Sequence, residues 1–120
     1  MLFVLQSVRA GNVELLQPPH WLAEVAEVIA RLEPDLADEA MDVLDAMELP
    51  VAVDVAVYKR ATSLSAALRQ HVFDTLYHAV ALEYGAELIS ADRRYCRVAK
   101  HFGRITYLAN WERLQQGAAR

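Results

Sequence analysis

Three acidic residues stand where alternating strands and helices would bring them to one edge of a sheet. Glu24 lies in the first two turns of an expected helix, Asp74 opens another helix, and Asp92 directly follows an expected strand. Clustered carboxylates repel one another, and a hard divalent cation such as Mg²⁺ or Mn²⁺ relieves that repulsion. A metal held in this way orients and activates water for attack on a phosphodiester. The three acids are therefore candidate metal ligands and catalytic residues.

Each of these acids also has an ordinary structural explanation. Asp92 is suited to N-capping the basic helix that follows it, and Asp74 is a first-turn acid of the kind that the helix dipole favours. Glu24 shares a polar line with Glu27 and Arg31, of which the last two are spaced as an i,i+4 ion pair. Spacing alone leaves the metal site and these structural roles open.

The elements that must position the acids alternate between strand and helix. Apolar residues at helical spacing predict helices over residues 20–32, 35–49, 55–68, 72–84 and 92–102, and residues 1–10 are expected to form a short helix ending at Gly11. Strands are expected at Val13–Leu16, Val51–Val53, Glu87–Ser90 and Ile105–Leu108. Such alternation predicts an α/β fold in which a short parallel sheet is covered by five or six helices. Ligands in such folds gather at the carboxyl ends of the strands.

Two of the expected helices have predicted buried lines that the structure can test. In the helix at residues 35–49 the line consists of Leu36, Ala40, Val43 and Met47. In the helix at residues 72–84 the inward residues are expected to be Phe73, Leu76, Tyr77 and Val80. His78 shares a helical line with Asp74, so two roles are open to it: approach to a metal, or a buried, hydrogen-bonded histidine. His20 has no partner pattern.

Composition limits the class of protein. The chain of 120 residues, with 55% hydrophobic and 23% charged residues, is expected to form a single domain over residues 1–120 with a sizeable core. One cysteine, Cys96, excludes an intramolecular disulfide framework. The apolar runs are too short to span a bilayer, and no signal peptide is evident. A cytoplasmic location without membrane contact is expected.

Charge is unevenly distributed along the chain. Residues 1–60 hold 11 acids and 4 bases, whereas residues 61–120 hold 5 acids and 8 bases. Five of the twelve lysines and arginines fall between Arg93 and Arg104. This basic segment is compatible with a nucleic-acid contact, and equally with a solvated helix face.

Three short segments resemble motifs of one nuclease family. HVFDTLYHA (residues 71–79) and LISADRRY (residues 88–95) resemble the C-terminal half of PIN domains, most closely the VapC-type toxin ribonucleases of toxin–antitoxin pairs. PPHWLAEVA (residues 18–26) resembles the second acidic motif of that family. Each motif is short, but the three occur in the family's order over residues 13–111.

The resemblance implies a three-layer α/β/α fold and an Mg²⁺- or Mn²⁺-dependent endoribonuclease. Glu24, Asp74 and Asp92 match the acidic positions of the family and would be its metal ligands. Ser90 matches a position that hydrogen-bonds within the site, and Arg93 and Arg94 would meet RNA phosphates. The family further implies a cytoplasmic homodimer that is neutralised by an antitoxin protein.

The chain departs from the family at its start. PIN domains open with a strand that carries an Asp ligand, and no acid precedes Glu14 in this sequence. Gln6 occupies the nearest comparable position, but a parallel crossover from it to the strand at Val13 would be too short. We therefore expect the domain to be N-terminally truncated relative to the family. Residues 2–6, or a second chain, would have to fill the place of the missing central strand.

Three functions remain open at this stage. The first is a metal-dependent ribonuclease, which would cleave RNA poorly because a principal ligand is missing. The second is a catalytically weak PIN-like module that binds a protein partner. The third is a small α/β interaction domain whose resemblance to PIN domains is confined to the fold.

Overall fold

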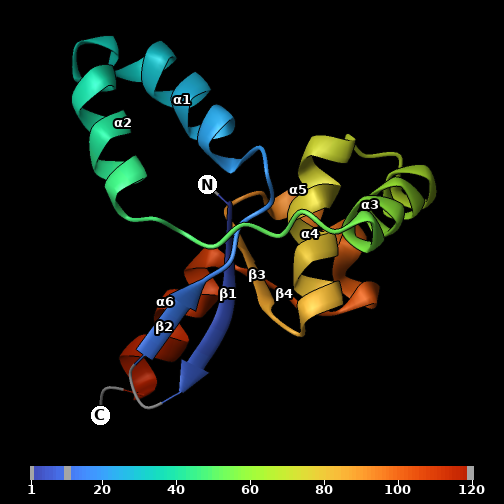
Figure 1. Cartoon of the computed structure of the whole chain (residues 1–120). Helices are drawn as coiled ribbons and strands as arrows, with labels where there is room; N and C mark the ends of the chain where they lie inside the picture. Colours follow the sequence, from blue (N-terminus) through green and yellow to red (C-terminus); the bar gives the residue numbers. More distant parts are fainter. Residues whose placement is uncertain (1, 10–11, 119–120) are drawn as a thin grey trace.

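The fold is built around a four-stranded sheet (Figure 1). The computed structural model describes the backbone of residues 2–9 and 12–118 and the side chains of residues 13–114. The strands are β1 (Leu2–Arg9), β2 (Asn12–Leu15), β3 (Glu87–Ser90) and β4 (Ile105–Tyr107), arranged in the order β2-β1-β3-β4. β3 and β4 are parallel and are joined through the helix α5 (Arg93–Ala99), as the sequence predicted.

The expected helix at residues 1–10 is wrong, because residues 2–9 form the strand β1. β1 lies between β2 and β3 and is antiparallel to both, so it fills the place in the sheet that the sequence left empty. Only two residues separate β1 from β2, and a parallel connection needs a dozen or more. The antiparallel hairpin is the arrangement that this short connection allows. The C-cap expected at Gly11 lies outside the described residues.

The register of β1 settles where Gln6 lies in the sheet. Leu2 pairs with Ser90 and Leu5 pairs with Glu87, so the start of β1 adjoins the carboxyl end of β3. Gln6 follows Leu5 and lies roughly 13 Å along the strand from Leu2. It is therefore at the end of the sheet opposite to the carboxyl end of β3. The position of Gln6 therefore does not replace the Asp that opens PIN domains.

The expected strand at Val51–Val53 is reduced to one parallel bridge between Gln17 and Val51. The amide of Gln17 donates to the carbonyl of Pro50, and the amide of Ala52 donates to the carbonyl of Gln17. These bonds tie together the two chain segments that lead into and out of a pair of helices. Pro50 interrupts the segment and has no amide hydrogen to extend the ladder.

The helices α1 (Trp21–Leu32) and α2 (Ala37–Ala46), with a 3₁₀ turn at Pro34–Leu36 between them, form an arm that projects from the body of the domain (Figure 1). The radius of gyration, 14.7 Å, exceeds the value of about 13.6 Å expected for a compact chain of this length. The predicted buried line of the second helix is wrong: Leu36, Val43 and Met47 are each at least half exposed. These residues follow helical periodicity, but the arm has no sheet to pack on.

Four further helices bring the number in the described part of the chain to six. The expectation that five or six helices cover the sheet is met only in number, because α1 and α2 form the arm, and α4, α5 and α6 are the helices that pack on the strands. α3 (Val55–Leu68) packs on α4 (Val72–Tyr84), and α4 packs on β1 and β3. α5 continues into a 3₁₀ turn at Lys100–Phe102, and α6 (Leu108–Ala118), which the sequence analysis did not anticipate, contacts β3 and β4. No helix among the described residues is long and apolar enough to cross a membrane.

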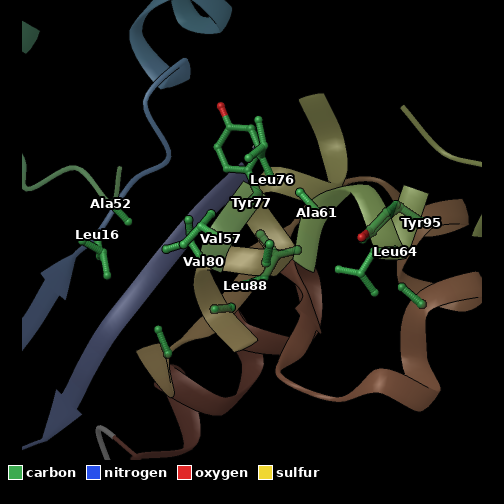
Figure 2. Close-up of a cluster of buried hydrophobic side chains, with 14 residues drawn as sticks. Leu16, Ala52, Val57, Ala61, Leu64, Leu76, Tyr77, Val80, Leu88 and Tyr95 are labelled. Atoms are coloured by element: carbon green, nitrogen blue, oxygen red, sulfur yellow. The ribbon is translucent and has the colours of Figure 1, made fainter. Parts of the chain in front are cut away.

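The core lies between the sheet and the helices α3 and α4 (Figure 2). Leu88 and Ile89 are both essentially inaccessible to solvent and point to opposite faces of β3, so the strand is covered on both faces. Leu76, Tyr77 and Val80 are buried as predicted, but Phe73 is 63% exposed. Phe73 lies in the first turn of α4, beyond the end of the sheet on which that helix packs.

His78 has the structural role rather than the metal-binding one. Its Nε2 is 2.7 Å from the carbonyl oxygen of Gly103, which only accepts, so Nε2 carries the hydrogen. Nδ1 then accepts from the Tyr95 hydroxyl at 3.0 Å. Burial lowers the pKa of His78, which keeps the ring neutral and suits it to these two bonds. The histidine thereby ties α4 to α5 and to the turn before β4.

Candidate functional site

Each of the three predicted acids lies at the start of a helix, and the charge of Asp74 is felt by Glu24 just as that of Asp92 is felt by Asp74. Glu24 lies in the first turn of α1, Asp74 lies in the first turn of α4, and Asp92 is the N-cap of α5. Burial raises the pKa of Asp74 and of Glu24, and charge repulsion raises both further, from Asp92 on Asp74 and from Asp74 on Glu24. We call these three carboxylates the acidic edge. Each stands in or directly before the first turn of its helix, where the positive end of the dipole offsets part of the repulsion.

Asp92 is held in place by two local hydrogen bonds. Its Oδ1 accepts from the backbone amide of Tyr95 at 3.0 Å, which is the N-cap bond of α5. Its own amide donates to the hydroxyl of Ser90 at 3.0 Å. Ser90 is fully buried, so it fixes the turn that links β3 to α5. The N-cap bond uses Oδ1, and Asp92 is exposed to solvent.

Asp74 lies between the other two acids and is half-buried. Burial is the main cause of the rise in its pKa, and the nearby charge of Asp92 is the second. Burial raises the pKa of the Tyr77 and Tyr95 phenols, and the charge of Asp74 raises both further. The partial burial of the Asp74 carboxylate strengthens its attraction to a cation.

His20 is the residue that sequence reasoning missed. Its Nε2 lies 2.7 Å from the carbonyl oxygen of Phe73 and 3.3 Å from Oε1 of Glu24. The ring also packs edge-on against Tyr77, with the centroids 5.0 Å apart. His20 thus joins the start of α1 to the start of α4 and brings Glu24 toward Asp74. The i,i+4 spacing of His20 and Glu24 was the available signal.

The donor chemistry of the acidic edge suits a hard divalent cation, since it consists of carboxylate oxygens. Burial is the main cause of the raised pKa of Glu24 as well, followed by an opposing contribution from His20 and then by Asp74. In the part of the chain that the structure describes, no three His, Cys, Asp or Glu side chains lie close enough to hold a metal directly. The residues fit the charge and type of such an ion, but they do not close a complete ligand shell around it.

The two arginines predicted to meet RNA lie at the start of α5, directly after Asp92, and both are exposed. The guanidinium of Arg93 lies over the ring of Tyr107, 5.2 Å from its centroid. Arg93 lines a concavity between α5 and α6, whereas Arg94 does not. Of the two arginines predicted to meet RNA, only Arg93 therefore lines the concavity.

The comparison with family models agrees with this geometry. The model of the PIN domain matches residues 5–101, which is most of the chain, and the chain therefore belongs to the PIN domain family. Members of this family are nucleases that in general depend on divalent metals and act on nucleic acid. No curated protein and no solved structure matches the chain.

The proximity of Asp74 and Asp92 is testable without any metal. Replacing Asp92 with asparagine removes the negative charge next to Asp74 and keeps an N-capping side chain on α5. We expect the pKa of the Asp74 carboxyl to fall toward its ordinary value in D92N, as followed by NMR during a pH titration. D45N, on the exposed side of α2, serves as the control and should leave the pKa of Asp74 unchanged. An equal pKa in the wild type and D92N would show that the two carboxylates are not neighbours.

Proposed function

We propose that this chain is a divalent-metal-dependent endoribonuclease of the VapC type, with Glu24, Asp74 and Asp92 holding Mg²⁺ or Mn²⁺. The proposal is supported by membership of the PIN domain family and by the position of each acid at the start of a helix, with the charge of Asp74 acting on Glu24 and that of Asp92 acting on Asp74. An ion at this edge would share its remaining positions with water, since the protein side chains do not close its shell.

The roles of the residues follow from their surroundings. A divalent ion bound at the acidic edge would supply Lewis-acid activation of water and stabilise the charge that develops on a phosphodiester. Ser90 and the N-cap bond hold Asp92 in one position, and His20 holds Glu24 against the start of α4. Arg93 and Arg94 adjoin Asp92 and would neutralise phosphates that approach three carboxylates.

The proposed activity is weak. Gln6 lies toward the end of β1 that is far from Ser90, and β1 contains no acidic residue. The strand therefore places no fourth acid beside Ser90. With three carboxylates the ion is placed less firmly, and a displacement of about 1 Å from the productive position costs roughly a hundredfold in rate. Because only three carboxylates would hold the ion, we expect this chain to cleave RNA slowly. A form that carries the family's opening Asp strand should cleave it faster.

RNA cleavage in the presence of Mn²⁺ tests the assignment of the acids. We expect slow cleavage of a labelled RNA by the wild-type chain, and loss of that cleavage in D74N and D92N. Both replacements keep the size of the side chain, and asparagine is as good an N-cap as aspartate, so the helices should persist. E27Q, on the exposed side of α1, is the control and should cleave as the wild type does. Cleavage that survives in both D74N and D92N would remove the site from the acidic edge.

A second candidate function is a catalytically weak module that binds a protein partner. It is favoured by an apolar groove of about 420 Å³ between the arm and the body, lined in part by Trp21, Val25, Val28, Leu44 and Met47. Apolar residues exposed on the same arm extend this surface. For either function we propose a homodimer and an antitoxin protein as the partners, since this surface exposes apolar side chains to them.

Sedimentation equilibrium tests the homodimer. Val28 is 43% exposed and lines the groove, so V28K places a charge in the apolar surface without disturbing a buried position. We expect the wild-type chain to sediment as a dimer and V28K as a monomer. V53K is the matched control, because Val53 is 66% exposed and lies outside the groove. A V28K chain that dimerises as tightly as V53K would exclude this face as the interface.

A further inference from the structure

A concave surface lies on the side of the domain formed by α5, β4 and α6. Its volume is about 920 Å³, at the upper end of the range of roughly 300–1,000 Å³ typical of ligand pockets. The cations that line it are Arg93 and Arg97 from α5, Lys100 at the start of the 3₁₀ turn that continues α5, and Arg113 from α6. Among its described lining residues Glu112 is the only acid. We call this surface the basic concavity.

The cations are on one side of α5 because of their spacing. Positions 93, 97 and 100 follow i, i+4 and i+7, which places three side chains in a row about 10 Å long on one face of the helix. All three are exposed, and none forms an ion pair with an acid in the part of the chain that the structure describes. The row is therefore an unneutralised line of positive charge on a protein whose formal net charge is −4.

Arg93 is a cation at the first position of a helix, where acidic residues are usually preferred. A cation at this position meets the positive end of the dipole, which is unfavourable. The ring of Tyr107 offsets this by receiving the guanidinium on its face and holds it toward the concavity. Positive charge together with an aromatic ring in a groove is typical of surfaces that bind single-stranded nucleic acid.

The basic concavity begins one residue after Asp92. Asp92 is the N-cap of α5, and Arg93 is the first residue of the same helix. We propose that the basic concavity binds the phosphate backbone of single-stranded RNA and leads it to the acidic edge. This inference rests on the proposed ribonuclease function and names where the substrate lies. The hollow shape favours a strand over a flat anionic membrane, and the row of charges matches a polymer of phosphates.

The dependence of RNA binding on salt tests the inference without cleavage. Binding of a fluorescein-labelled single-stranded oligoribonucleotide is measured by anisotropy in EDTA, over a series of KCl concentrations. Each phosphate contact to a single strand contributes about 0.7 to the slope of log K against log salt. The double variant R97Q/K100Q should therefore lose about 1.4 from that slope and bind roughly 25-fold more weakly at 0.1 M KCl.

The control variant is matched in charge and in residue types. R31Q/K59Q also removes one arginine and one lysine, both exposed and outside the concavity, and should keep the wild-type slope. R113Q tests the same surface from α6 and should lose about 0.7 from the slope. Circular dichroism confirms that each variant is folded.

The outcomes separate this inference from the proposed function. Loss of slope in R97Q/K100Q and R113Q, but not in the control, supports the concavity whether or not the wild-type chain cleaves RNA. Equal slopes in R97Q/K100Q and R31Q/K59Q overturn it, even if the wild-type chain cleaves RNA in Mn²⁺. An equal loss in both double variants also overturns it, because the effect would then reflect net charge alone.

Discussion

The electrostatic repulsion of Asp74 by Asp92 and of Glu24 by Asp74 is the interaction on which the proposed site at the acidic edge depends. Burial and this repulsion raise the pKa of Glu24 and of Asp74, so their carboxylates are costly to ionise. Each acid stands at the start of a helix, and the positive end of that helix offsets part of the cost. A cation would relieve the repulsion that remains.

The fold separates three kinds of surface around this edge. The basic concavity begins one residue after Asp92 and follows α5 and α6, while the arm formed by α1 and α2 carries the exposed apolar residues. Glu24 belongs to the same helix as that apolar surface, since it also lines the groove beside Trp21 and Val28. A protein bound on the arm would therefore lie directly beside the acidic edge, where it would affect access to the site.

The sequence signals that marked the three acids as candidates were local. Asp92 follows the apolar strand β3, and Asp74 falls in the first turn of a helix with a clear buried line. Parallel pairing of β3 and β4 also followed from the helix between them. The contact of His20 with Phe73 joins residues 53 positions apart, and no periodicity within one helix contains that information.

The incorrect predictions also depended on contacts between distant parts of the chain. Residues 2–9 form a strand because β2 and β3 pair with them on both sides, and such tertiary pairing overrides local propensity. The second helix of the arm has a regular apolar line, yet Val43 and Met47 are exposed because the arm projects from the body. Periodicity identifies the apolar face of a helix, but it does not show what that face packs against.

The account depends most directly on whether one divalent ion binds at the acidic edge. Crystals of the chain soaked in Mn²⁺ and measured for anomalous scattering would locate the ion. The account predicts a single anomalous peak between Glu24, Asp74 and Asp92, completed by water and absent in D74N. A bound Mn²⁺ elsewhere on the protein, with no peak at the end of β3, would contradict it.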